Sequence, residues 1–274
     1  MTNTHPHYQT SNVSSEVYEF AQHYELNLNQ DPLMRLESML QAFTKMPYEN
    51  LSKVIKWNAH KSTSRSKRTP EEVIRDHLRY NTGGTCFELT STLLYMIRFV
   101  GFKAEPILAD RPYGQNTHCA MVIEVDGKWH LVDPGFLILK PLCLTKEPNI
   151  EVKTCFNDLV LSGHADNDHI DLFTRWKTQC TYRLTYKAKP ADPAEFLSAW
   201  DSSFYWDMMR YPLLTKTMNH TQIYMRKNHL QNRSRTSVES LDLHAGNTTE
   251  EIISRFGIHK SIVFKALQLF EKVK

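Results

Sequence analysis

Two apolar segments of the chain, 120–125 and 128–133, are separated only by the dipeptide Asp-Gly at 126–127. An Asp-Gly pair between two apolar runs is the strongest short-range signal for a β-hairpin with a two-residue loop. The loop length fixes the register of the two strands, so Ala120 pairs with Asp133. The hairpin therefore determines which side chains of the two strands share a face.

His118 and Asp133 share a face in this register. Side chains alternate along a strand, so His118 points to the same side as Ala120, and Asp133, opposite Ala120, points there too. The two are diagonal neighbours with backbones roughly 7–8 Å apart, within reach of a side-chain hydrogen bond. A histidine oriented by a carboxylate is the base that a cysteine nucleophile needs. His130 is a competing candidate, but it lies beside the turn. His118 is therefore the better candidate for the base.

A candidate nucleophile lies in the segment TGGTCFEL at 82–89. Its two glycines allow a sharp turn, and apolar residues at helical spacing follow as far as Gly101. Cys86 is therefore expected at a helix N-terminus, where the dipole and the free N–H groups favour the thiolate. A lone cysteine there is more often a small core residue. The histidine and carboxylate on one strand face reverse that preference and complete a candidate triad.

Other patterns indicate the arrangement of helices along the chain. Proline at the first helical position predicts helices that begin after Asp31, Thr69 and Asp192. Glu72 completes a capping box with Thr69. Two more helices are predicted near the C-terminus, one from a capping box of Thr248 with Glu251 and one from the apolar periodicity of 262–269.

Strands are predicted mainly in the middle of the chain. Short segments rich in Val, Ile, Leu and Trp occupy 103–144, and a further strand pair is expected at 181–186. A late hairpin is expected from 222–226 and 230–233. Helices thus dominate the first third and strands the middle, and the last third mixes both, which is typical of an α+β protein.

Composition excludes several classes of function. The net charge of +3 over 274 residues is too small to argue for nucleic acid. We find no apolar signal segment and no run long enough for a membrane span. The five cysteines are scattered without a CxxC pair, which argues against disulfides and zinc and favours the reducing cytoplasm. The basic stretch 61–68 is interpreted as a solvated loop, and HADNDH at 164–169 as a polar surface loop without metal-ligand spacing.

Several segments resemble the arylamine N-acetyltransferases, and the resemblance covers most of the chain. Family members carry Arg-Gly-Gly-aromatic-Cys-aromatic-Glu around the nucleophile, where this chain has TGGTCFE at 82–88. They carry Pro-Phe-Glu-Asn-Leu upstream, where this chain has PYENL at 47–51, and Val-Asp-Val-Gly-Phe-Gly at the catalytic Asp, where it has VDPGFL at 132–137. The segments MRKNHLQNRS at 225–234 and FGI at 256–258 are also similar to the family.

The resemblance implies a three-part fold with a papain-like Cys-His-Asp active site. A helical bundle over 1–100 would carry the nucleophile at a helix N-terminus. A central β-barrel over 101–190 would carry the His and the Asp, and an α/β lid with a C-terminal helix would follow over 191–274.

The resemblance also implies a reaction. Acetyl coenzyme A would acetylate Cys86, and the acetyl group would then pass to an arylamine or arylhydrazine by a ping-pong route. His118 and Asp133 would complete the triad, with no metal, no nucleic acid and no membrane involved. Gly135 and Phe136 would line the pocket, and Thr117 is a further candidate contact for the substrates. The resemblance names neither the acceptor amine nor the oligomeric state, which depend on side chains outside these motifs.

Four positions depart from the family pattern. Thr82 replaces the Arg before Gly-Gly, Thr85 the aromatic residue before Cys, Thr90 an Asn, and Leu137 a Gly. Threonine carries no charge, and Leu is not expected to take a positive φ as readily as Gly does. We therefore expect these changes to weaken binding of the acyl donor more than they weaken the triad.

Two other kinds of function stay open on the sequence alone. The first is a related thiol enzyme, either an amide synthase or cyclase with an acyl donor other than coenzyme A, or a transglutaminase- or protease-like hydrolase. The second is a non-enzymatic protein that keeps the fold and binds a partner. Acetylation of Cys86 by acetyl coenzyme A would distinguish an acetyltransferase from such a related thiol enzyme. An unperturbed Cys86 thiol would support the non-enzymatic protein.

Overall fold

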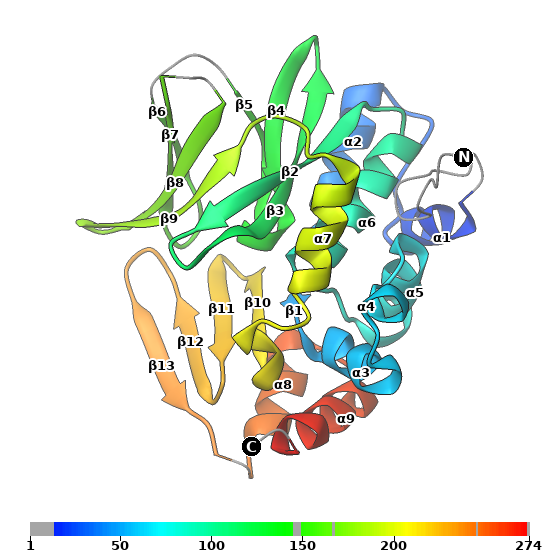
Figure 1. The fold of residues 1–274 in the computed structure, drawn as a ribbon, viewed down its shortest axis with the longest axis vertical. Coiled ribbons are helices and arrows are strands. Elements are labelled where there is room, and N and C mark those ends of the chain that lie inside the picture. The colour runs from blue at the N-terminus through cyan, green and yellow to red at the C-terminus, as the bar shows by residue number, and fades with distance from the viewer. Residues whose placement is uncertain (1–13, 145–148, 166–167, 245, 273–274) are drawn as a thin grey trace.

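The computed structural model describes residues 14–144, 149–165, 168–244 and 246–272. Helices dominate the first hundred residues and return at the end of the chain (Figure 1). They are α1 (Ser15–His23), α2 (Pro32–Phe43), α3 (Leu51–His60), α4 (Thr63–Ser66), α5 (Pro70–Tyr80), α6 (Cys86–Phe99), α7 (Pro193–Ser202), α8 (Thr248–Phe256) and α9 (Lys260–Glu271), with 3₁₀ turns η1 (Pro134–Phe136) and η2 (Asp207–Arg210). None of the helices in this part of the chain is long and apolar enough to cross a membrane.

The strands form two antiparallel sheets. The larger one has eight strands in the order β5-β4-β3-β2-β9-β8-β7-β6, and the smaller has five in the order β1-β10-β11-β12-β13. The larger sheet contains β2 (Ala104–Arg111), β3 (Gly114–Val125), β4 (Lys128–Asp133), β5 (Ile138–Cys143), β6 (Asn149–Lys153), β7 (Asp158–Gly163), β8 (His169–Trp176) and β9 (Gln179–Lys187). The smaller contains β1 (Tyr48–Glu49), β10 (Leu213–Met218), β11 (Thr221–Arg226), β12 (His229–Arg233) and β13 (Val238–Asp242).

The three helices predicted from N1 prolines are confirmed as α2, α5 and α7. Asp31 and Asp192 accept hydrogen bonds from the first free N–H groups of α2 and α7, and Thr69 and Glu72 form the predicted capping box on α5. The capping box predicted for Thr248 is wrong. Asn247 precedes α8, and the Thr248 hydroxyl donates to the carbonyl of His244 instead.

The predicted hairpin is β3–β4, and its register is confirmed. Val125 pairs with Lys128 and Met121 with Val132 around the Asp-Gly loop. Alternate residues of β3 enter two different cores. Cys119 and Met121 pack toward α6 in a core shared with the helices, whereas Ala120 belongs to a second core inside the curled eight-stranded sheet. The late hairpin is also confirmed, as β11–β12.

Segments far apart in the sequence join the two ends of the chain. The short strand β1 pairs with β10 of the five-stranded sheet, and α3 packs against α9. Figure 1 shows the eight-stranded sheet above the five-stranded one, with α6 and α7 beside them. The fold therefore comprises a helical N-terminal part, a curled β-sheet and a mixed C-terminal part, as expected, while the unit boundaries at 100 and 190 stay a prediction.

Candidate active site

The three candidate triad residues come from three different elements. Cys86 is the first residue of α6, His118 lies in β3, and Asp133 is the last residue of β4. The His118 Nε2 and Asp133 Oδ2 atoms are 2.7 Å apart, and both side chains are fully buried. Strand alternation predicted this contact, since both residues point to one face of the hairpin.

Gly135 lies where the three side chains converge. A Cβ atom at this position would be 2.8 Å from His118 Cε1, 3.2 Å from Asp133 Oδ1 and 3.2 Å from Cys86 Cβ. Contacts this short leave no room for a side chain. The glycine of the η1 turn thus lets the backbone pass directly beside the thiol and the imidazole, and the three residues form one cluster.

Asp133 has two further hydrogen-bond donors. The Tyr186 hydroxyl donates to Asp133 Oδ2 at 2.7 Å, and the Phe136 N–H donates to Oδ1 at 3.0 Å. Both donors fix the carboxylate so that it faces His118. Sequence reasoning missed Tyr186, because its approach depends on the pairing of β9 with β2, which no local pattern indicates.

Arg111 contacts the other nitrogen of His118 and was also missed. Its Nη2 lies 3.0 Å from His118 Nδ1. A guanidinium is donor only, so this contact requires Nδ1 to accept and places the imidazole proton on Nε2, toward Asp133. The Arg111 guanidinium also lies 5.5 Å from the Phe136 ring centre and bonds the Tyr113 hydroxyl.

The electrostatic surroundings favour a thiolate at Cys86. The hydrogen bond from Cys119 lowers the pKa of the Cys86 thiol well below its ordinary value, and His118 and Arg111 lower it further against the effect of burial. Cys119 shows the reverse, because burial and the neighbouring Cys86 charge raise its pKa. Burial opposes the charged form of His118, yet Asp133 raises the pKa of that imidazole overall. The cluster can therefore hold a reactive thiol and a base together.

A pocket of 440 Å³ opens beside the cluster, between the two sheets. Gly135 and Phe136 line it, as predicted, and Phe136 packs edge-on against the His118 ring at 5.1 Å. Thr117 does not line it. The Thr117 hydroxyl donates to the carbonyl of Gly114 in the β2–β3 turn. The remaining lining residues are Tyr48, Arg111, Tyr113, Leu137, Phe156, Asn157, Leu159, Thr174, Arg183, Leu213, Thr215, Gln222, Tyr224, Gln231 and Arg233.

Other candidates lie away from this cluster. The His130 Nδ1 is 3.0 Å from the carbonyl of Lys128 beside the hairpin turn. In the stretch 164–169, positions 166–167 lie outside the described residues, and the His164 N–H donates to the carbonyl of His169 to close the β7–β8 hairpin. Within the described ranges, no group of three or more His, Cys, Asp or Glu side chains could hold a metal ion.

A family model for N-acetyltransferases matches residues 32–263. The chain belongs to this family of enzymes. The comparison with curated protein sequences returned no match.

Solved structures show that the fold is that of the arylamine N-acetyltransferases. The Mycobacterium marinum enzyme matches with a TM-score of 0.77 and 16% identity, over 94% of this chain and 99% of that one. The same enzyme in complex with CoA matches with a TM-score of 0.75 and 15% identity, over 94% and 99%. A Bacillus cereus arylamine N-acetyltransferase with a Cys-His-Glu triad matches with a TM-score of 0.69 and 17% identity, over 90% of this chain and 100% of that one.

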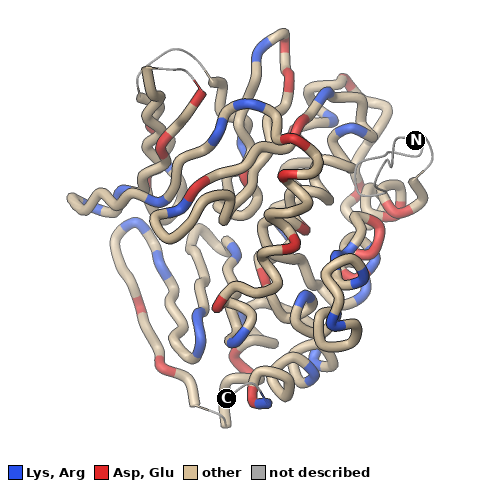
Figure 2. The backbone as a smooth tube through the Cα atoms, in the orientation of Figure 1, with Lys and Arg blue, Asp and Glu red and all other residues tan. Residues whose placement is uncertain are grey.

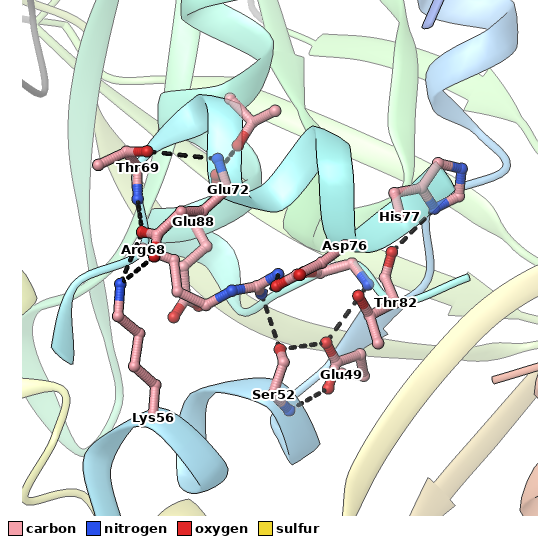
Figure 3. A network of polar contacts seen from close by, with 12 residues as sticks. Glu49, Ser52, Lys56, Arg68, Thr69, Glu72, Asp76, His77, Thr82 and Glu88 are labelled. Atoms are coloured by element: carbon pink, nitrogen blue, oxygen red, sulfur yellow. Dashed lines mark hydrogen bonds and ion pairs between the residues drawn. The ribbon is translucent and has the colours of Figure 1, made fainter. Parts of the chain in front are cut away.

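The basic stretch 61–68 contributes to the site, and its interpretation as a solvated loop is wrong. Residues 63–66 form the short helix α4, and Arg68 is only 2% exposed. The Arg68 Nη1 donates to the Gly83 carbonyl and to Ser52 Oγ, both at 2.7 Å, and Nη2 pairs with Asp76 at 2.8 Å (Figure 3). Although Thr82 replaces the family's Arg before Gly-Gly, a guanidinium from another segment still contacts this turn.

The PYENL segment holds the same turn from the other side. The Glu49 carboxylate accepts from the Gly83 N–H at 3.3 Å and from the Ser52 hydroxyl at 2.5 Å (Figure 3). A Cβ on Gly83 would be 1.8 Å from the carbonyl oxygen of Pro47, so no other residue fits. The Gly-Gly turn that precedes Cys86 is therefore fixed by close backbone packing and by a buried ion network.

Glu88 caps the helix that begins with Cys86. Its Oε2 accepts from the Thr85 N–H at 2.7 Å and from the Thr85 hydroxyl at 2.5 Å. The buried Lys53 ammonium lies 3.4 Å from the same hydroxyl and bonds Ser203. Glu88 thus satisfies a free N–H group at the start of the helix, and it does not line the pocket.

Leu137 adopts the backbone conformation that it was expected to avoid. Its φ of 62° and ψ of 27° lie in the left-handed region, at the end of the η1 turn. A non-glycine residue there costs of order 1–3 kcal/mol. The expectation overlooked that the turn geometry is imposed by Asp133, which accepts the Phe136 N–H and closes the turn. The Leu137 side chain forms part of the pocket wall.

Proposed function

We propose that the protein transfers an acetyl group from acetyl coenzyme A to an arylamine or arylhydrazine through an acetyl-Cys86 intermediate, with His118 as base and Asp133 as its orienting carboxylate. One observation carries the proposal. Cys86, His118 and Asp133 meet around the side-chain-free Gly135, and the His118–Asp133 contact is 2.7 Å long and fully buried.

The first half-reaction forms the acyl-enzyme. His118 Nδ1 takes the thiol proton, and the Cys86 sulfur attacks the thioester carbonyl of the donor. The new carbon–sulfur bond forms as the bond to the coenzyme A sulfur breaks, and the departing thiolate takes the proton from His118. Asp133 stabilises the imidazolium between these steps without becoming protonated itself.

The second half-reaction releases the product. The acceptor nitrogen attacks the acetyl carbon, His118 takes a proton from that nitrogen, and the carbon–sulfur bond to Cys86 breaks. The thiolate left on Cys86 is the form that the surroundings favour, because Cys119, His118 and Arg111 all lower its pKa. A good leaving group at this position speeds the second step, since lower-pKa thiols leave faster.

The donor is inferred from the family and from a related structure. The Mycobacterium marinum enzyme in complex with CoA has the fold of this chain. The five cysteines of this chain are all free thiols, which suits a protein of the reducing cytoplasm whose nucleophile must stay reduced.

Intact mass after brief exposure to acetyl coenzyme A tests the proposal. The expected result is a gain of one acetyl group on Cys86, located by peptide mapping, and its loss when an arylamine is added. Cys86→Ala should gain nothing, and Cys180→Ala, which alters an exposed cysteine, should behave as wild type. A chain that stays unmodified by acetyl coenzyme A but is acylated by another thioester would identify an amide synthase instead. Hydrolysis of the acyl-enzyme without transfer would identify a hydrolase.

A further inference from the structure

Three arginines line the pocket, and no Asp or Glu of the described residues does. They are Arg111 beside the triad, Arg183 from the eight-stranded sheet and Arg233 from the five-stranded sheet. Within the described ranges, none of the three forms an ion pair with a carboxylate. Figure 2 shows basic positions at the facing ends of the two sheets, in the left half of the view. A pocket with this lining holds uncompensated positive charge.

Arg183 is directed into the pocket by a β-bulge. The pairing of β8 with β9 runs from Leu172–Leu184 to Phe173–Tyr182, so Arg183 is the extra residue without a partner. Bulges beside active sites commonly re-aim a side chain in this way. The Arg183 Nε donates to Thr174 Oγ1 at 2.7 Å, which holds the guanidinium against the pocket wall.

Arg233 approaches from the opposite wall. It is the last residue of β12 and pairs with Gln222 of β11, which also lines the pocket. Its Nε is buried without a hydrogen-bond partner in the described part of the chain, and one terminal nitrogen bonds Gln231 at 3.3 Å. Burial and the charge of Arg233 lower the pKa of the Arg183 guanidinium, and both side chains line the same pocket. A ligand in the pocket can supply the acceptor that this buried Nε–H lacks.

We propose that Arg183 and Arg233 bind a carboxylate on the acceptor, so that the substrates are aromatic amines or hydrazines with a carboxylate at the end remote from the nitrogen. This inference rests on the proposed acetyl transfer and specifies its acceptor class. Planar guanidinium groups match carboxylates with two parallel hydrogen bonds, which fits a pocket that holds two of them.

The rest of the pocket favours an aromatic acceptor over the phosphates of the donor. Tyr48, Phe136, Phe156 and Tyr224 provide ring surfaces in the same pocket. Arg183 lies three residues along β9 from Tyr186, which contacts Asp133, so the cationic end is about 10 Å from the triad in strand length. The 440 Å³ volume is at the lower end of the range for small-molecule pockets. One substituted ring suits this space better than a whole coenzyme.

A pair of matched acceptors tests the inference. 4-Aminophenylacetate and 4-aminophenylacetamide differ in charge, while the methylene group insulates the ring and keeps the two amines similarly nucleophilic. Wild-type enzyme should show a higher acceptor kcat/KM for the acid, by about ten- to hundredfold, as expected for charge-assisted hydrogen bonds. The double variant Arg183→Gln/Arg233→Gln should lose this preference. Arg183→Lys should retain part of it, and Arg226→Gln, an exposed arginine of the same small sheet, should retain all of it.

Two controls test the carboxylate site separately from the proposed acetyl transfer. The acetylation of Cys86 by p-nitrophenyl acetate should be unchanged in the double variant, because that uncharged donor needs neither arginine. Titration calorimetry of the acid and the amide against wild-type and double-variant protein, without donor, measures the same preference without turnover. If Cys86 is never acetylated but the calorimetric preference disappears in the double variant, the proposed function fails and the carboxylate site stands.

Three results would overturn the inference. Wild-type enzyme could treat the acid and the amide alike, or the preference could survive in the double variant. Alternatively, the double variant could raise the KM of acetyl coenzyme A and leave the acceptor preference intact, which would assign the arginines to the donor phosphates. Thermal melts of each variant confirm that the fold is kept.

Discussion

His118 presents its two nitrogens to different partners, and this division decides what the imidazole can do. Nε2 faces Asp133, and Nδ1 faces Arg111. Nδ1 is therefore the nitrogen left to take the thiol proton, because Nε2 is committed to the carboxylate. In the resting geometry the Nδ1 lone pair accepts a hydrogen bond from Arg111. This hydrogen bond must break before Nδ1 can take the proton of Cys86. The tautomer is thus set from both sides of the ring.

Asp133→Asn tests this division. The amide oxygen can still accept the Phe136 N–H, which directs the amide nitrogen toward His118 Nε2. Nε2 must then accept, the proton moves to Nδ1, and the base is lost. The same tautomer change in a serine-protease triad lowers turnover by about 10⁴-fold. We expect a similar fall in the acylation rate, measured by stopped flow with p-nitrophenyl acetate, with circular dichroism unchanged. A variant within about threefold of wild type would remove Asp133 from the triad.

Cys119→Ala should shift the pH dependence of Cys86 reactivity. The hydrogen bond from Cys119 is the largest cause that lowers the pKa of Cys86, so its loss raises that pKa toward the ordinary value. Alkylation by iodoacetamide requires the thiolate. In the variant the alkylation rate should therefore begin to rise at a higher pH than in wild type. Between the two pKa values the variant should react more slowly than wild type, and above both values the two rates should be equal.

Cys180→Ala is the matched control, since Cys180 is exposed on β9. Superimposable alkylation profiles for wild type and Cys119→Ala would show that His118 and Arg111 alone activate the thiol.

The start of α6 depends on elements that are distant in sequence. The Gly-Gly turn is held by Glu49 from β1 and by Arg68 from the segment between α4 and α5. A cation and a carboxylate thus reach the turn from two sides, and Ser52 links them. The position of Cys86 consequently depends on the packing of the whole helical part. We expect changes in this network mainly to lower the free energy of unfolding.

Arg68→Met keeps an unbranched side chain but removes the guanidinium and its charge. The Gly83 carbonyl and the Glu49 carboxylate then stay buried without the guanidinium. Breaking one side of a buried pair costs about 3–5 kcal/mol, and because Asp76 is partly exposed we expect about 3 kcal/mol, measured by urea unfolding. Arg65→Met, an exposed residue of α4, should change the stability by less than about 0.5 kcal/mol. Equal effects of the two changes would contradict the role assigned to Arg68.

Local patterns predicted elements whose determinants are local. The register of β3–β4 follows from the Asp-Gly loop and from alternation, and with it the contact of His118 with Asp133. The prolines likewise marked the starts of α2, α5 and α7, because an N1 proline acts within one turn. The triad residues were accessible from the sequence for this reason.

Features that depend on distant pairings could not be predicted in the same way. The pairing of β8 with β9 places Arg183 at a bulge, and no residue near Arg183 signals it. Arg68 looked like part of a solvated basic run, because the buried Glu49 and Gly83 that attract it lie in other segments. Leu137 was misjudged since a turn closed by Asp133 outweighs a propensity of a few kcal/mol.

At the scale of the whole molecule, the five-stranded sheet is fastened to the eight-stranded one beyond the pocket. Arg235, in the β12–β13 turn, donates to the carbonyl of Thr154 at 2.8 Å and pairs with Asp158 at 2.8 Å. The Trp176 indole N–H donates to the carbonyl of Ser234 at 3.0 Å. These contacts join the tips of both sheets beside Asn157 and Arg233, which line the pocket. Their strength should govern how freely substrates enter.

Arg235→Ala should loosen this end and leave the triad untouched. The change removes an exposed ion pair of little net worth and the hydrogen bonds to the carbonyls of Thr154 and Asn157, each about 1 kcal/mol, so local opening should become about thirtyfold more frequent. Hydrogen exchange should accelerate at 234–238, and the acceptor KM should rise while the p-nitrophenyl acetate burst stays constant. In wild type, Arg235 lowers the pKa of Asp158, so the ion pair persists at mildly acidic pH and is lost only as the pH falls through that lowered value. The exposed Arg226→Ala is the control. Unchanged exchange at 234–238 in Arg235→Ala would show that Trp176 and the strand pairing hold the sheets together without this arginine.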